Sequence, residues 1–387
     1  MPELIVLFLL LPVAAATGWF AARWRDSSRR DRTSSLSSNY FRGLNYLLNE
    51  QPDKAIEVFL KIAEINQDTV ETHLALGNLF RRRGEMDKAI RFHKHIITRP
   101  NLTDEQRSQA LFELGEDYMR AGLLDRAERL FVELLDHDPR ARIPARQLLD
   151  IYQQEKDWEK AIEKARHLQG SDEESEHWIA QFYCELAQSA LEKDEVEQVR
   201  KMLRQARRYD PRNPRARLLQ GDLAWRHELW EEAAGHYRDA CELDADCSVA
   251  VIDRIVVCHR KVDAIPELVE WLEQLVERTP MTTPALVLAR IKAERDPQQA
   301  VDFLLERMAR RPTVRGLEYL MELLNRQGVG LDQLGPEMIR DLMQKLLEGQ
   351  PRYRCQHCGF SGSAYHWLCP SCRRWNTTRV IAGVLGE

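Results

Sequence analysis

A repeat of about 34 residues is the feature that most constrains how this chain can fold. In one segment Gly77 is followed after 12 positions by Ala89, and in the next Gly115 is followed after 12 positions by Ala127. The second of these positions recurs along the chain at steps of 34, 38, 34, 38, 34, 35 and 32 residues. Such a period predicts a solenoid, in which each unit buries its apolar face only against its neighbours. The recurring positions are Ala55, Ala89, Ala127, Ala161, Val199, Ala233, Leu268 and Ala300.

Each unit contains two helical patterns of about a dozen residues each. Proline follows the second helix at Pro139, Pro211 and Pro280, where it ends a helix without breaking the hydrogen bonds inside it. These features resemble the tetratricopeptide repeat family over residues 37–315. The resemblance implies an all-α fold, an open right-handed superhelix with a long concave surface.

The first helix of each unit would line that concave surface if the tetratricopeptide pattern is carried over by position. Side chains there would bind a partner protein. Another interpretation stays open, because charged runs such as residues 81–83 and 200–217 are often ordinary solvated helix faces. The candidate partner-binding residues are Asn78, Arg81, Arg82, Glu116, Arg120, Asp222, Trp225 and Arg226.

Four cysteines near the C-terminus have the spacing of a metal site. The pattern C-x2-C-x10-C-x2-C is formed by two pairs, Cys355 with Cys358 and Cys369 with Cys372. In each pair one tight turn can aim both sulfurs at the same point. Two disulfides or a redox dithiol are the alternatives. A cytoplasmic location disfavours stable disulfides, and no βαβ pattern surrounds either pair.

This segment resembles rubredoxin and the zinc ribbons, through the shared patterns C-x-x-C-G and C-P-x-C. One position departs from rubredoxin, because Arg373 stands where rubredoxin has glycine after its last cysteine. We therefore expect one structural metal ion, with zinc favoured over iron, which in the same four thiolates would be a one-electron carrier. His357 and His366 are expected at the surface, since four sulfurs complete a tetrahedron.

The metal module is too small to fold without its ion. About 31 residues cannot bury enough surface for a stable core, so metal binding would supply most of the folding free energy. Its aromatic side chains exceed what such a module can enclose, and Trp367, Trp375 and Phe360 are expected to pack on the last helices. We predict docking near residues 317–324 and 338–346, because the connector spans only residues 349–351.

An uncharged segment of 19 residues, 4–22, opens the chain. As a helix it would span about 28 Å, enough to cross a bilayer. A net charge of +3 in residues 23–32 follows it, and the positive-inside rule places that flank in the cytoplasm. The sequence therefore predicts a single-pass inner-membrane protein with a periplasmic N-terminus and a cytoplasmic body. A cleaved signal peptide and an apolar core helix are the alternatives.

Composition and motifs argue against several classes of protein. A net charge of −5 from 56 basic and 61 acidic side chains gives no broad footprint for nucleic acid. No Gly-rich phosphate loop, H-E-x-x-H, C-x-x-C-H or G-x-S-x-G motif occurs, so we expect no catalytic residues and a protein that is not an enzyme. The remaining cysteines fall inside helical patterns and are expected in the core as small apolar side chains, namely Cys184, Cys241, Cys247 and Cys258.

The order of these parts resembles the lipopolysaccharide assembly protein B family of bacteria. That resemblance implies an inner-membrane adaptor that recruits LpxC, the deacetylase committing lipid A synthesis, for degradation by the protease FtsH. It also implies contact with other inner-membrane lipopolysaccharide regulators or assembly proteins, and it leaves a homodimer open. A scaffold for envelope-synthesis enzymes without proteolysis and a rubredoxin-type electron carrier are the rival functions.

Four segments are predicted from these observations. Residues 1–25 form the anchor with its basic flank, and residues 26–39 form a linker. Residues 40–348 form the solenoid of about eight to nine tetratricopeptide repeats. Residues 352–387 form the rubredoxin-like metal-binding domain.

Overall fold

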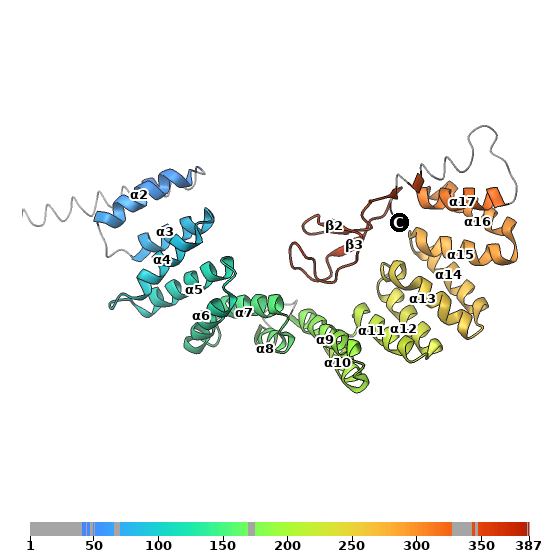
Figure 1. Cartoon of the computed structure of the whole chain (residues 1–387), viewed down its shortest axis with the longest axis horizontal. Helices are drawn as coiled ribbons and strands as arrows, with labels where there is room; N and C mark the ends of the chain where they lie inside the picture. Colours follow the sequence, from blue (N-terminus) through green and yellow to red (C-terminus); the bar gives the residue numbers. More distant parts are fainter. Residues whose placement is uncertain are drawn as a thin grey trace, which may run out of the picture. The chain divides into compact units, whose positions relative to one another are not determined.

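The structure is a computed structural model that describes residues 41–43, 45–46, 49, 51–65, 70–168, 175–326, 343–344, 347–384 and 386. The regular secondary structure of the described part is helical except for three short strands near its C-terminal end (Figure 1). The predicted fold class, an all-α tetratricopeptide architecture with a small C-terminal stranded module, is confirmed.

The chain divides into two compact units, Met1–Glu155 and Lys156–Glu387. The helices of the first unit are α2 (Pro52–Ile65), α3 (Val70–Arg82), α4 (Met86–Ile97), α5 (Asp104–Arg120), α6 (Leu124–His137) and α7 (Arg142–Glu155). Those of the second unit are α8 (Trp158–Leu168), α9 (Ser175–Glu192), α10 (Val196–Tyr209), α11 (Pro214–Arg226), α12 (Trp230–Leu243), α13 (Cys247–Lys261), α14 (Ile265–Arg278), α15 (Thr282–Arg295), α16 (Pro297–Arg310) and α17 (Val314–Arg326). Its strands are β1 (Tyr353–Cys355), β2 (Ser361–Gly362) and β3 (Thr378–Val380).

Helical hairpins build both units, as the repeat predicts. Helices α3 and α4 pack together, as do α5 and α6, α9 and α10, and α11 and α12. The recurring positions of the repeat lie on the even-numbered helices from α2 to α16, and all eight have an exposed fraction of 0%. Their burial explains why the period is visible in the sequence.

A glycine on the first helix allows a large ring on the second to lie against its backbone. A methyl group added to Gly115 would come within 2.6 Å of the Phe131 ring, and one added to Gly221 within 2.5 Å of the Tyr237 ring. In both hairpins the ring follows the glycine by 16 residues and is fully buried. Any side chain at these glycines would push the two helices apart.

The turns inside the hairpins share one geometry. The N–H of Glu85 donates to the carbonyl of Phe80 at 2.9 Å, and the N–H of Leu229 donates to that of Ala224 at 2.9 Å. The residue before each donor has a positive φ, 81° at Gly84 and 59° at Glu228. This is the Schellman ending of a helix, which glycine adopts without strain and glutamate adopts at some cost.

The helix ends confirm the predicted role of proline. Helix α6 ends two residues before Pro139, α10 two residues before Pro211, and α14 two residues before Pro280. At the next start, Asn213 accepts a hydrogen bond from the N–H of Ala216 at 3.1 Å. Proline therefore stops one helix while a polar cap begins the following one.

The four cysteines outside the metal motif are buried in the helical core, as predicted. Burial raises the pKa of the Cys184 thiol to about 12, and it raises that of Cys241 to about 12. Burial also raises the pKa of Cys258 to about 11. These thiols therefore stay protonated at neutral pH and behave as small apolar side chains.

The localisation prediction needs correction. Its predicted membrane helix, residues 4–22, and the linker that follows lie outside the described residues. Among the residues that the structure describes, no helix is both long enough and apolar enough to cross a bilayer. The reason is amphipathic character: even α9, with 18 residues, carries Glu176, Glu185 and Glu192, whereas a crossing needs roughly 20 mainly apolar residues. The structure gives no support to a single-pass inner-membrane protein.

Candidate metal centre

Two equivalent turns present the four cysteines. Strand β1 lies between β2 and β3 in an antiparallel sheet and ends at Cys355. The first turn is closed by the N–H of Gly359, which donates to the carbonyl of Cys355 at 2.9 Å. The second is closed in the same way by the N–H of Arg373, which donates to the carbonyl of Cys369 at 2.9 Å. We call the module formed by residues 352–384 the knuckle.

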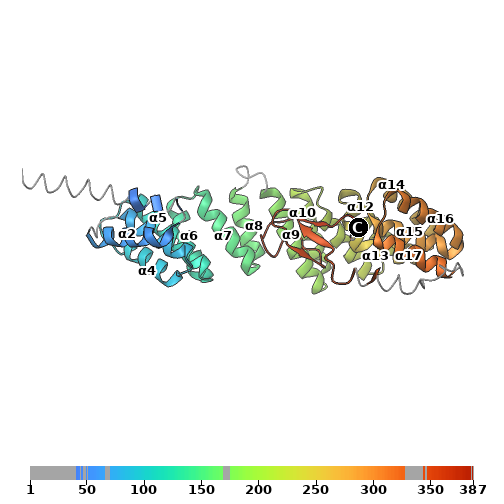
Figure 2. The same ribbon diagram turned by 90° about the horizontal axis from the view of Figure 1, so that it is seen from above.

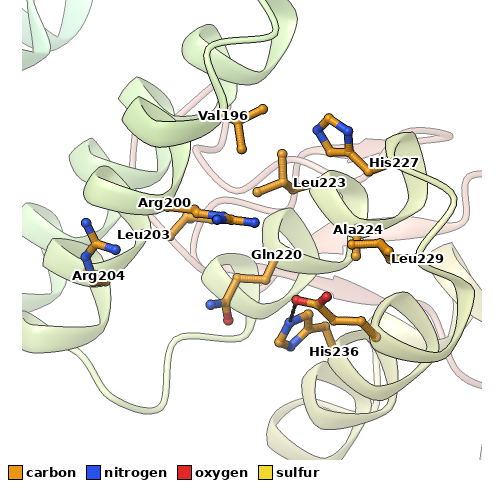
Figure 3. A pocket seen from close by; sticks show the side chains of 11 residues that line it. Val196, Arg200, Leu203, Arg204, Gln220, Leu223, Ala224, His227, Leu229 and His236 are labelled. Atoms are coloured by element: carbon orange, nitrogen blue, oxygen red, sulfur yellow. Dashed lines mark ion pairs between the residues drawn. The ribbon is translucent and has the colours of Figure 1, made fainter.

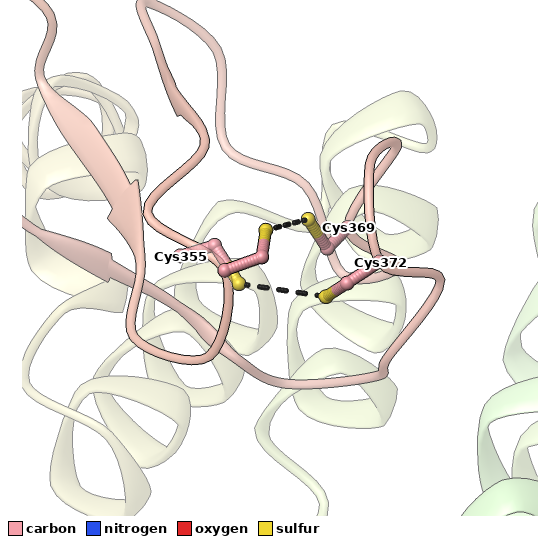
Figure 4. Close-up of side chains that lie close together, drawn as sticks. Cys355, Cys369 and Cys372 are labelled. Atoms are coloured by element: carbon pink, nitrogen blue, oxygen red, sulfur yellow. Dashed lines mark hydrogen bonds between the residues drawn. The ribbon is translucent and has the colours of Figure 1, made fainter. Parts of the chain in front are cut away.

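The four sulfurs face one another across the two turns (Figure 4). All lie within 4.8 Å of each other, and the distances from Cys355 Sγ to Cys372 Sγ and from Cys358 Sγ to Cys369 Sγ are both 3.7 Å. A disulfide requires about 2.05 Å. A zinc–sulfur bond of about 2.3 Å gives tetrahedral edges of about 3.8 Å. The cysteines are therefore arranged to bind one metal ion with four thiolates.

The surroundings of the sulfurs differ: a backbone hydrogen bond favours the thiolate at Cys358, whereas burial raises the pKa of Cys372 to about 12. The backbone N–H of Phe360 lowers the pKa of Cys358 below its ordinary value. Cys355 Sγ lies 3.2 Å from the Thr377 hydroxyl. His357 is exposed, and the ring of His366 packs against that of Phe360 with centroids 6.0 Å apart. Among the described residues, the cluster that could hold a metal comprises the four cysteines without either histidine.

Both turns need a residue in the left-handed region. Gly359 has a φ of 78° and Arg373 has a φ of 53°. The arginine that departs from the rubredoxin pattern therefore occupies the same conformation that glycine takes in the first turn. A side chain in this region costs about 1 kcal/mol relative to glycine.

We expect Arg373→Gly to stabilise the metal-bound knuckle by about 1 kcal/mol, or roughly fivefold in metal affinity. Competition with a chelator measures this directly. Arg374→Gly is the matched control, because Arg374 is an exposed neighbour without a positive φ. Equal affinities for the Arg373→Gly variant and the unchanged chain would contradict the role assigned to the left-handed turn.

Aromatic contacts attach the knuckle to the middle of the second unit, not to its last helices (Figures 1 and 2). Trp375 packs edge-on against Trp158 of α8, with centroids 6.4 Å apart, and against Phe182 of α9, at 6.0 Å. Trp367 packs on the apolar core built by α11 to α15. The guanidinium of Arg215, on α11, lies 5.9 Å from each of the two tryptophan rings.

Two side chains of α9 hold the Arg215 guanidinium in place. Only 4% of it is exposed, its side chain donates to Gln188 Oε1 at 2.8 Å, and it pairs with Glu185 at 2.9 Å. A buried guanidinium with carboxylate and amide partners is well satisfied. Its flat face is therefore fixed where the knuckle docks.

Polar contacts fix the orientation of the docked knuckle. Asn376 Nδ2 donates to His177 Nε2 at 2.6 Å, and His177 Nδ1 donates to Asp210 Oδ2 at 2.9 Å. The bond from His177 lowers the pKa of Asp210. Farther along, Arg379 donates to Asp244 Oδ2 at 2.9 Å.

The predicted docking site is therefore wrong. Residues 338–342 and 345–346 of that site lie outside the described residues. Trp375 and Trp367 pack on α8, α9 and α11 instead of residues 317–324, and Phe360 packs on His366 within the knuckle. The tail does reach α17, where the N–H of Val314 donates to the carbonyl of Val384 at 2.9 Å. A short connector limits where the knuckle starts, but complementary aromatic and charged side chains decide where it packs.

The candidate partner-binding residues have different surroundings in the two units. In the second unit, Asp222 accepts from the Tyr237 hydroxyl at 2.7 Å, Trp225 packs edge-on against Trp230 at 5.1 Å, and Arg226 donates to the carbonyl of Leu191. These side chains hold neighbouring helices together.

In the first unit two candidates, Arg82 and Arg120, are exposed. Arg81 is half-buried and donates to Asn78 Oδ1 at 2.7 Å and to Asp117 Oδ1 at 2.9 Å. Glu116 is half-buried too, and burial raises its pKa.

The sequence analysis missed a buried ionic cluster in the first unit. Asp117 and His93 are both 0% exposed, and Asp117 Oδ2 lies 2.6 Å from His93 Nδ1. The other carboxylate oxygen of Asp117 binds Arg81. One signal in the sequence could have indicated that His93 is buried. His93 follows Gly77 by 16 residues, the same spacing at which the buried Phe131 follows Gly115.

Comparison with known proteins extends these observations. Residues 353–379 match a family model described as a rubredoxin metal binding domain, and residues 36–69, 72–106, 112–176 and 184–246 match tetratricopeptide repeat models. Over 386 residues the chain is 36% identical to lipopolysaccharide assembly protein B of Escherichia coli, covering 98% of this chain and 99% of that protein. The protein of the same name from Haemophilus influenzae is 31% identical over 392 residues, covering 97% and 98%.

A solved structure, the C-terminal part of a tetratricopeptide repeat-containing protein from Cytophaga hutchinsonii, is 15% identical with a TM-score of 0.38. It covers 70% of this chain and 94% of its own.

Proposed function

Because the chain belongs to the lipopolysaccharide assembly protein B family, we propose that it regulates lipopolysaccharide synthesis as a non-catalytic adaptor. In this proposal the repeats bind the deacetylase LpxC and present it to the protease FtsH. Both units are scaffolds of helical hairpins. An adaptor of this kind acts by effective concentration, since a client held beside its protease meets it more often than a freely diffusing one.

The proposal rests on one difference between the two units: the knuckle packs on first helices of the second unit, whereas first helices of the first unit keep charged side chains exposed. In the second unit the knuckle packs on α9 and α11, so that surface is engaged within the chain. In the first unit, α3 and α5 keep Arg82 and Arg120 exposed beside half-buried Asn78 and Glu116. We therefore assign client binding to the first helices of the first unit.

Reversing charge on this surface tests the assignment. We expect the double variant Arg82→Glu and Arg120→Glu to weaken binding of purified LpxC by about tenfold or more, because charges at an interface enforce correct pairing. The matched control is Arg91→Glu with Arg129→Glu, two exposed arginines on the second helices α4 and α6. Calorimetry gives both affinities, and equal losses in the two variants would contradict the assignment.

The lifetime of LpxC in cells separates the adaptor from a scaffold that has no role in proteolysis. Depletion of the protein should lengthen the half-life of LpxC, and the Arg82→Glu and Arg120→Glu variant should fail to restore it. An unchanged half-life after depletion would favour the scaffold instead.

We further propose that the knuckle binds zinc. Four thiolates give a closed site with no open position for substrate, which suits a structural ion, and zinc has no redox chemistry. The residues that would hold it are Cys355, Cys358, Cys369 and Cys372. Metal analysis of a colourless protein with one zinc per chain would support this proposal. Iron, with visible thiolate-to-metal absorption, would favour the electron carrier.

A further inference from the structure

A pocket of about 350 Å³ lies between the second helices α10 and α12, with α11 at its base (Figure 3). Its polar rim is mainly cationic or hydrogen-bond donating. On one side, Arg200 of α10 reaches toward the middle of the pocket and Arg204 of the same helix lies at its outer edge, while His227 and His236 stand across from them. The carboxylate on this rim is Glu232, which already lies 3.5 Å from His236 Nε2.

The two arginines of the pocket are poorly neutralised by the protein. Arg200 and Arg204 are four residues apart and therefore lie on the same face of α10, where like charges repel. Arg200 pairs with Glu197 at 3.5 Å, longer than the 2.7–2.9 Å typical of a charge-assisted hydrogen bond. Arg204 is exposed, and within the described residues its side chain has no ion-pair or hydrogen-bond partner.

A further donor and an apolar floor complete the pocket. The carbonyl oxygen of Gln220 accepts from Arg217 at 3.4 Å, which leaves the amide of Gln220 as a donor. Leu203 and Leu223 line the pocket below these groups and are 1% and 8% exposed. The volume is near the lower limit for small-molecule sites. A small anion with a short apolar extension would fit this arrangement.

We propose that this pocket binds a phosphate monoester. Guanidinium groups match the oxygens of a phosphate, and the dianion would offset the repulsion between Arg200 and Arg204. The leucines would contact the carbon chain attached to the ester oxygen. The ligand chemistry is shared by soluble alkyl phosphates and by the headgroup of phosphatidic acid.

Titration of the full chain with butyl phosphate and inorganic phosphate tests the proposal. The imidazole C–H signals of His227 and His236, followed by NMR, should shift in a saturable manner. Butyl phosphate should bind several-fold more tightly than inorganic phosphate, because its carbon chain is removed from water.

The double variant Arg200→Gln and Arg204→Gln should weaken butyl phosphate binding by about tenfold or more. Arg207→Gln with Arg208→Gln is the matched control, since it removes the same charge from exposed positions of the same helix. This control should bind almost as tightly as the unchanged chain. His227→Gln, at an exposed position, provides an independent variant and should also weaken binding.

A vesicle-binding experiment distinguishes a lipid headgroup from a soluble phosphate monoester. Cosedimentation with phosphatidic acid vesicles, absent with phosphatidylcholine vesicles and lost in Arg200→Gln with Arg204→Gln, would assign the pocket to a lipid headgroup. Binding of butyl phosphate without such cosedimentation would assign it to a soluble phosphate monoester. Shifts that do not saturate, or an equal loss in the control variant, would overturn the proposal.

Discussion

Replacing Cys369 with serine is expected to release the metal, unfold the knuckle and expose the surface of α9 and α11 on which it docks. Cys369 is 0% exposed, and its sulfur faces the other three. A hydroxyl is a far weaker ligand than a thiolate for a soft site. Metal binding at structural zinc sites supplies about 10–16 kcal/mol, so a module of this size has no other comparable source of stability.

Hydrogen exchange should report the loss at two places far apart in the sequence. Amides of residues 353–380 should exchange much faster, and those near Phe182 and Arg215 should lose part of their protection. The first unit should be unaffected, since the knuckle contacts described here all lie in the second unit. His357→Ala is the control, because this exposed neighbour of the cysteines lies outside the sulfur cluster. Unchanged protection around Phe182 after loss of metal would contradict the docking contacts.

The second large effect is expected from Asp117→Ala in the first unit. The Asp117 carboxylate is fully buried and binds Arg81 at 2.9 Å and His93 at 2.6 Å. Arg81 is itself only 12% exposed in its side chain. Its removal takes away the carboxylate that His93 contacts and leaves Arg81 with Glu113 as its remaining ion-pair partner. We therefore expect a cost of about 3 kcal/mol, the lower end of the range for breaking a buried ion pair. That is a large share of the stability of an ordinary domain.

An apolar replacement of the whole cluster should restore part of the lost stability. We expect the triple variant Arg81→Met, His93→Phe and Asp117→Leu to recover part of the free energy of unfolding lost in Asp117→Ala, because the charges of Arg81 and Asp117 are removed together. Recovery is incomplete because the Glu113 side chain, 14% exposed, loses its pairing with Arg81. The phenylalanine would occupy the place that Phe131 has against Gly115 in the next hairpin. Denaturant unfolding, with hydrogen exchange to locate the change in α3 to α5, measures both variants. A triple variant as unstable as Asp117→Ala would show that the cluster is irreplaceable.

Local patterns in the sequence identified much of the fold. The positions from Ala55 to Ala300 repeat because each lies in the core on an even-numbered helix, and all are fully buried. The prolines after α6, α10 and α14 mark helix ends because a proline has no N–H to donate and its ring clashes with the preceding turn of a helix. The four cysteines could be recognised because two chelating turns are local structures, closed by bonds such as that from Gly359 to Cys355.

The contacts of the knuckle could not be found in this way. Asn376 binds His177, 199 residues earlier in the chain, and Arg379 binds Asp244, 135 residues earlier. Neither partner belongs to a spacing pattern. The buried Asp117 was missed for a related reason, since its partners Arg81 and His93 lie on two other helices. On sequence alone, Asp117 has the appearance of a solvated helix position.

The sequence by itself determined the helical repeat, the ends of its helices and the set of four metal ligands, because each depends on residues within one or two turns of the chain. Only the tertiary structure decided that the knuckle docks on α8, α9 and α11, and that Arg200, Arg204, His227 and His236 share one pocket. The physical reason is that docking and pocket formation depend on which surfaces are complementary after the helices have packed. Periodicity specifies which face of a helix is buried, but it carries no information about which distant side chain will lie against that face.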